Sequence, residues 1–329
     1  MILDAFLHSL NCVAILIILG SAGYITAHLG WYDDKSSALI AKLVTFMSLP
    51  AYLFSSVMQN LTHDELLGLV PQLVVPFCSI ATGFLLSLVI VRFGHINVVH
   101  KGIFSSAFTC SNNMFIGVPV ALALFGEEAL IPTLFYFFAN TTFFWTIGNF
   151  LEARDGALAT HVKPQPIFSL DTIKRVFSPP FCGFLLAMFF VAIDWRPPEF
   201  LMTSAKYMGG ITSPLALIFI GLMLYTIGIR NIRFTNDLLW VFAGRFVISP
   251  LVCLALSIVF PISPLFAKVY VIQAALPCIT QIAVLAKHHH ADAKFATTCV
   301  AGTTLGCLVA LPIWMIILTT LLNSSSRPL

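Results

Sequence analysis

Long apolar stretches recur along the whole chain, separated by short polar segments. Each is close to the roughly 20 residues that a helix needs to cross a bilayer. The pattern predicts an all-α polytopic membrane protein with two five-helix halves, at 1–150 and 176–329, joined by the longest polar connection at 151–175. The ten predicted transmembrane helices cover about 5–28, 37–58, 67–91, 102–125, 129–150, 176–195, 208–228, 238–260, 265–286 and 295–322.

The two halves repeat each other in the positions of their prolines. Pro50 in the second span matches Pro214 in the seventh, and Pro119 in the fourth matches Pro277 in the ninth. Five spans is an odd number, so the second half must enter the membrane from the opposite side. We therefore expect a 5+5 inverted repeat with spans four and nine broken and crossed, as in secondary transporters. The alternative is that prolines are simply common in membrane helices.

The stretch CSNNMFIGVP, Cys110 to Pro119, places polar residues inside the fourth predicted span. Pro119 has no N–H and its ring crowds the carbonyl four residues back, so an unbroken helix is not expected. Backbone groups freed in lipid need partners from protein or from a water-lined cavity. Asn112 and Asn113 beside this break therefore predict a ligand site, and helix-to-helix hydrogen bonds are the alternative.

Composition supports the membrane assignment. Apolar residues make up 59% of the 329 residues and charged residues 9%, and the mean hydropathy is +0.95. A soluble domain carries roughly a quarter charged residues. A net charge of +3 gives no reason to expect a nucleic-acid partner. The first 30 residues lack a basic segment and are expected to form a true first helix, not a cleaved signal.

No cofactor or metal is expected. The eight cysteines contain no CxxC pair, and most fall in apolar segments, where buried free thiols are common. His288–His290 are consecutive, so their side chains point around a helix instead of converging on a metal, and an interfacial patch is the simpler interpretation.

Lysines and arginines indicate the orientation. Most of them fall in loops that are cytoplasmic if the N-terminus is outside. The positive-inside rule then predicts that both termini lie outside and that the connection at 151–175 lies in the cytoplasm. The predicted location is the inner membrane of the cell.

Charged residues inside the spans indicate the substrate class. The 14 carboxylates all fall in predicted loops or within about two turns of a span end, and none at mid-membrane depth. Cation exchangers commonly keep such an acid in the pathway, so this class is disfavoured. Arg245 lies about two turns inside the eighth span, where it must meet carbonyls, a hydroxyl or an anion. A buried cation without a facing carboxylate indicates an anionic substrate.

Amides and hydroxyls are expected to complete the site, because they donate hydrogen bonds without carrying charge into a dry cavity. Tyr136 and Asn140 lie one helical turn apart on the fifth span and are candidates to face the cavity. Pro119 and Pro277 are assigned as crossover prolines, and no catalytic residue is assigned. The predicted substrate-binding residues are Ser111, Asn112, Asn113, Tyr136, Asn140, Arg245, Cys278, Thr280 and Gln281.

Four stretches carry a resemblance to a known family: SNNMFIGVP ending at Pro119, VIQAALP ending at Pro277, RFVISP from Arg245 to Pro250, and LVALP ending at Pro312. They resemble the auxin efflux carrier superfamily, which includes plant PIN carriers and bacterial permeases assigned to malate, malonate and similar anions. The run from Cys278 to Gln281 and the three histidines depart from the family pattern. The central connection is short, so the bacterial type is the better match.

The resemblance implies a scaffold of spans one, two, six and seven and a transport unit of spans three to five and eight to ten. It also implies a substrate at the crossing, elevator-like movement and a homodimer. The sequence thus predicts a carrier, not an enzyme, for a small organic anion such as malate, malonate or an auxin-like molecule. No obvious proton carrier is present, which favours uniport or anion exchange. The alternatives are a sodium- or proton-coupled carrier of the bile-acid-transporter type, a membrane-embedded enzyme that uses the histidines, and a non-transporting sensor.

Overall fold

The computed structural model describes residues 2–63, 68–160, 177–228 and 232–324, and these contain helices and no β-strand. The α-helices are α1 (Ile2–His28), α2 (Asp34–Leu43), α3 (Leu49–Asn60), α5 (Val74–Phe93), α6 (Lys101–Thr109), α7 (Val118–Phe125), α8 (Leu130–Phe143), α9 (Asn149–Thr160), α11 (Pro179–Ala192), α12 (Glu199–Gly210), α13 (Thr212–Ile227), α14 (Asn236–Ala243), α15 (Ser249–Val259), α16 (Pro264–Ala274), α17 (Gln281–His288) and α18 (Ala293–Ser324).

Seven helical stretches among the described residues are long and apolar enough to cross a membrane. The predicted multi-pass helical membrane protein is therefore confirmed. The ten-span count and the 5+5 inverted repeat stay predictions. The fourth and ninth predicted spans are each divided into two shorter helices, α6 with α7 and α16 with α17.

Helical structure continues through three prolines, and a wide π-type turn comes directly before each one. A proline cannot donate to the carbonyl four residues back, and its ring crowds that carbonyl. In each case this carbonyl lies inside the wide turn, which absorbs the clash. The turns and their prolines are Val44–Ser48 before Pro50, Asn113–Gly117 before Pro119, and Gly244–Ile248 before Pro250.

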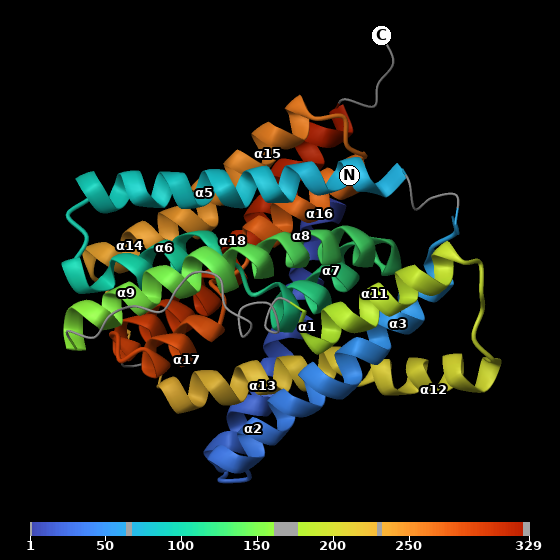
Figure 1. Ribbon diagram of the computed structural model, residues 1–329, viewed down its shortest axis with the longest axis horizontal. Coiled ribbons are helices and arrows are strands. Elements are labelled where there is room, and N and C mark those ends of the chain that lie inside the picture. The colour runs from blue at the N-terminus through green and yellow to red at the C-terminus, as the bar shows by residue number, and fades with distance from the viewer. Residues whose placement is uncertain (1, 64–67, 161–176, 229–231, 325–329) are drawn as a thin grey trace.

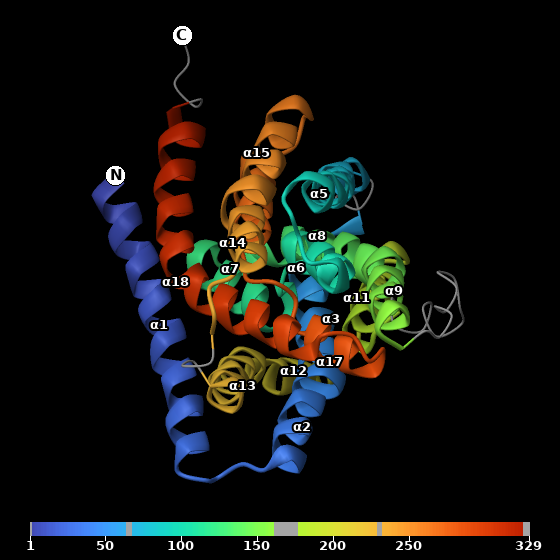
Figure 2. The ribbon, with the colours of Figure 1, turned by 90° about the vertical axis from the view of Figure 1, so that its left-hand side faces the viewer.

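The helices can be described as two sets, which meet where α1 lies along α18. In one, α1 lies along α13, and α3 packs on α11 and α12. In the other, α5 packs on α6, α8 and α15, while α17 lies on α18 (Figure 1). The α1–α13 contact is close because Gly23 faces the α13 backbone: a Cβ there would lie 2.0 Å from the Ile218 carbonyl oxygen. Figure 2 shows that α1 begins and α18 ends at the same end of the molecule, as two termini on one side of a membrane require.

The predicted central loop begins as a helix. α9 extends to Thr160, so residues 151–160 are helical and only 161–175 of the predicted loop lie outside the described residues. Glu152 and Asp155 in this stretch are 0% and 2% exposed. Assigning them to a polar connection was therefore wrong, because α9 packs on α6 and removes both carboxyls from solvent.

Candidate functional site

The interruptions of the two divided helices lie against each other. α6 ends at Thr109 and Cys110 takes an extended conformation, while α16 ends at Ala274. Ser111 and Cys278 then form an isolated antiparallel bridge. The Asn112 N–H donates to the Pro277 carbonyl at 2.9 Å, and the Ile279 N–H donates to the Cys110 carbonyl at 3.0 Å. We call residues 110–112 and 275–280 the junction.

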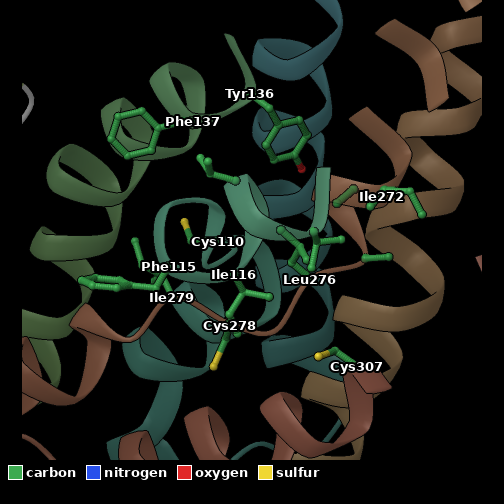
Figure 3. Close-up of a cluster of buried hydrophobic side chains, with 14 of the residues drawn as sticks. Cys110, Phe115, Ile116, Tyr136, Phe137, Ile272, Leu276, Cys278, Ile279 and Cys307 are labelled. Atoms are coloured by element: carbon green, nitrogen blue, oxygen red, sulfur yellow. The ribbon is translucent and has the colours of Figure 1, made fainter. Parts of the chain in front are cut away.

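The position of the first interruption differs from the sequence-based expectation. The helix is interrupted at Cys110–Asn112, several residues before Pro119, because the wide turn at Asn113–Gly117 accommodates that proline. Pro277 does lie in an interruption, where its carbonyl accepts the hydrogen bond from Asn112. Apolar side chains surround the junction, including Phe115, Ile116 and Ile272 (Figure 3).

Side chains from neighbouring helices satisfy the backbone of the junction. Asn140 on α8 accepts from the Ser111 N–H through Oδ1 and donates to the Ser111 carbonyl through Nδ2, both at 2.9 Å. In the other segment, the Cys278 N–H donates to Thr303 Oγ1 at 3.1 Å. Backbone groups outside helices need such partners where water is absent. Asn140 thus holds the junction, with both ends of its amide engaged.

Gln273 links the two divided helices and is a residue that the sequence analysis did not select. It is fully buried; its Oε1 accepts from Asn113 Nδ2 at 2.8 Å, and its Nε2 donates to the Gly117 carbonyl at 3.0 Å. A Cβ on Gly117 would lie 2.3 Å from Gln273 Oε1, so a larger residue there would have to displace the Gln273 amide. The available signal was a polar residue in the apolar run VIQAALP, four residues before Pro277.

Arg245 is fully buried and its guanidinium faces backbone carbonyls. These carbonyls belong to the C-terminal ends of α6 and α16, where the helix dipoles are negative. The sequence left carbonyls, a hydroxyl or an anion open as partners of Arg245, and the structure shows that its partners are carbonyls. Nε donates to Leu276 at 2.9 Å, Nη2 to Ala274 at 2.6 Å, and Nη1 to Thr109 at 2.5 Å and to Phe108 at 3.4 Å.

A cavity of about 440 Å³ opens beside the junction, and no charged side chain of the described residues lines it. Its size suits a small organic ligand. Asn112 Nδ2 and Asn113 Oδ1 are buried without a hydrogen-bond partner, which leaves one donor and one acceptor at this wall. Phe46, Phe137 and Trp145 supply apolar walls. The polar lining residues are Thr45, Ser111, Asn112, Asn113, Asn140, Thr141, Ser178 and Gln281.

The other predicted site residues are distributed differently. Thr280 lines a second cavity of about 440 Å³ next to α2 and α13, while Gln281 and Thr45 line both cavities. Tyr136 and Cys278, like Arg245, are buried and line neither cavity. Tyr136 packs against Tyr270 with ring centroids 6.1 Å apart.

A charged cluster lies away from these cavities and joins three segments. His100 Nδ1 lies 2.7 Å from Asp237 Oδ2, and its Nε2 lies 3.1 Å from Asp292 Oδ2. Partial burial alone would raise the pKa of Asp292, but hydrogen bonds from the Phe295 N–H and from His100 bring that pKa below its usual value. The cluster therefore fixes the start of α18 against α6 and α14.

The histidine run has an ordinary structural environment. His289 Nε2 lies 2.9 Å from Asn149 Oδ1 on α9, and His288 and His290 are exposed at the end of α17.

In a comparison with known protein families, residues 8–315 match the family model described as membrane transport protein. An uncharacterized transporter of Methanothermobacter thermautotrophicus is 27% identical over 318 residues, covering 95% of this chain and 99% of that protein. An uncharacterized transporter of Methanocaldococcus jannaschii is 24% identical over 309 residues, covering 93% and 97% of the two chains.

Proposed function

The chain belongs to the membrane transport protein family, as its resemblance to the auxin efflux carriers indicated, and we propose that it carries a small organic anion. The substrate is a mono- or dicarboxylate such as malate or malonate, bound in the cavity beside the junction. The observation that carries this proposal is a polar-lined cavity without charged lining residues in the described part of the chain, at the point where two helices are interrupted and where one amide donor and one amide acceptor lack partners.

The helix ends at the junction favour a negative ligand. Arg245 neutralises the C-terminal ends of α6 and α16 with four hydrogen bonds. The N-terminal ends of the segments that follow, at Asn113 and at Gln281, carry partial positive charge and lie at the cavity wall. Arg245 therefore acts on the ligand indirectly, by leaving the positive helix ends uncompensated.

The cavity walls come from both helix sets, which supports alternating access by an elevator-like movement. Thr45 and Phe46 belong to the set packed around α3, and Ser111 to Asn113 belong to the set packed around α5. We assign the first set as scaffold and the second as transport unit of an inverted repeat, with one divided helix from each half crossing at the junction. Homodimer formation belongs to the same proposal.

A polar contact bridges the two sets at one edge. Tyr52 Oη and Ser56 Oγ on α3 donate to Glu127 Oε2 at 3.0 and 2.9 Å. The partner carboxylate lies just before α8. Breaking these two bonds is a step that movement of the transport unit requires, so they stabilise the conformation seen here.

Counterflow in proteoliposomes tests the proposal. The purified protein, loaded with unlabelled carboxylates, is expected to take up labelled malonate or malate, and Asn112→Ala is expected to weaken this uptake. Loss of one hydrogen bond to a charged ligand costs about 1.5–3 kcal/mol, or about 10- to 100-fold in affinity. Gln59→Ala removes an exposed amide and serves as the matched control. Absence of counterflow for every carboxylate, or uptake that requires a sodium gradient, contradicts this proposal.

A further inference from the structure

Glu152 on α9 is a fully buried carboxyl that the proposed anion site does not use. Neither of its oxygens has a hydrogen-bond partner among the described residues, although the Ser106 hydroxyl approaches it from α6. An ionised carboxylate in such a place costs several kcal/mol unless a countercharge and hydrogen bonds compensate it. The neutral form needs no countercharge.

Asp155, one turn further along α9, differs from Glu152 because it has hydrogen-bond donors. Its Oδ2 accepts from the N–H groups of Gly102 and Ile103 at 2.6 and 2.9 Å. These donors form the N-terminal end of α6, where the helix dipole is positive. Glu152 has no such arrangement, and the charge that acts on it is that of Asp155, which opposes a second negative charge. A protonated Glu152 is thus the form that fits this environment.

The titratable groups on the elements packed around α9 provide no cation for Glu152. His100 is engaged with two carboxylates, and His289, directly after α17, is hydrogen-bonded to Asn149. The thiols of Cys110 and Cys278 lie within electrostatic reach of Glu152, which places it near the junction. The remaining charged groups on these elements are Lys101 at the start of α6, Arg154 on the exposed side of α9, and Lys287 and His288 at the exposed end of α17.

Unpartnered polar groups continue from Glu152 toward the cavity. The buried hydroxyls of Ser105, Ser106 and Thr109 on α6 lack hydrogen-bond partners, as do Asn112 Nδ2 and Asn113 Oδ1 beyond them. Thr109 lies four residues after Ser105 and three after Ser106, one helical turn along α6, and Asn112 and Asn113 follow in and after the interruption, at the cavity wall. Buried polar atoms without partners are rare and indicate sites for water or ions. Their succession along α6 and past the interruption that follows it indicates a polar route between Glu152 and the cavity.

We propose that Glu152 is a proton-binding site of the carrier, connected to the cavity along α6, and that one proton moves together with each anion. This rests on the proposed function. The carboxylate takes up a proton from water on the side where the cavity opens, which forms one O–H bond. It releases the proton on the other side, which breaks that bond. Coupling of this kind replaces the uniport or exchange favoured by the sequence.

Infrared difference spectroscopy tests the proton site without any substrate. The spectrum of the purified protein minus that of Glu152→Gln at neutral pH is expected to contain a protonated-carboxyl stretching band that shifts in D2O. Glu128→Gln changes an exposed glutamate and is expected to leave that band in place. A difference spectrum that contains only carboxylate bands means that Glu152 is ionised, which overturns the proposal.

Uptake of labelled malonate into proteoliposomes, with the membrane potential clamped at zero, tests the coupling. One proton per anion gives about tenfold accumulation for a gradient of one pH unit. Glu152→Gln is expected to lose this accumulation and keep malonate counterflow, whereas Glu128→Gln behaves like the wild type. Equal accumulation in Glu152→Gln and wild type, or accumulation driven by sodium and not by the pH gradient, refutes the coupling. Absence of malonate counterflow in the wild type counts against the anion carrier, and the infrared band still decides the proton site.

Discussion

Replacing Arg245 tests whether this residue organises the junction. In Arg245→Ala, the carbonyls of Phe108, Thr109, Ala274 and Leu276 lose their donor while they remain buried. Removing one member of a buried charged hydrogen-bond network costs about 3–5 kcal/mol. For large domains each kcal/mol lowers the melting temperature by about 2 °C, so we expect a decrease on the order of 5–10 °C. Arg245→Lys keeps the charge but not the planar fork, and an intermediate decrease is expected.

The protein contains its own reporters for this experiment. Six of its free cysteines are buried, among them Cys110 and Cys278 at the junction. A thiol-reactive fluorophore therefore reports unfolding during a temperature ramp in detergent. Arg233→Ala removes an exposed arginine and serves as the control, with an expected change within about 0.5 kcal/mol.

The same measurement separates the two roles considered for Arg245. If Arg245 supports the junction, Arg245→Lys melts earlier but is still stabilised by the carboxylates that stabilise the wild type. If Arg245 contacts the anion, the variant melts near the wild-type temperature and loses stabilisation by those carboxylates. The second result would refute the reasoning from the carbonyl contacts.

Three further changes are expected to have measurable effects. Gly117→Ala places a Cβ against Gln273 Oε1 and is expected to lower the free energy of unfolding by about 1–3 kcal/mol. Adding Gln273→Ala is expected to restore part of this loss, and an unchanged melting temperature in Gly117→Ala contradicts the close contact. Tyr52→Phe removes one bond to Glu127 and should shift the carrier away from the present conformation, measured as increased thiol labelling at the junction relative to wild type. Asp292→Asn is expected to lower the melting temperature at neutral pH. Because the pKa of Asp292 in the folded protein is lowered from 3.8, the difference in melting temperature from the wild type should persist to pH 5 and shrink only below about pH 4. A difference that vanishes by pH 5 contradicts the hydrogen bonds assigned to Asp292.

Local sequence signals were enough to identify a helical membrane protein and to select the stretches that meet at the junction. Apolar runs, prolines and amides are local signals, so the stretches around Asn112 and Pro277 could be selected without knowing the fold. The resemblance to a carrier family rested on these same stretches, and the family match confirmed it. The point of interruption was misplaced because a proline in a membrane helix has two outcomes, a break or a wide turn, and local sequence does not choose between them.

The hydrogen-bond partners of the polar groups depend on the tertiary structure and could not be read from the sequence. Arg245 donates to carbonyls that lie 29 to 137 residues away in the sequence. The Asn140 amide is hydrogen-bonded to the backbone of Ser111, 29 residues before it. Gln273 and Glu152 gave no strong local signal, yet both are fully buried. Burial and hydrogen-bond partners arise from helices that are distant in sequence, and the cost of an uncompensated charge depends on those neighbours. This is why the carboxyl that the sequence assigned to a loop became, in the fold, an enclosed group beside the junction.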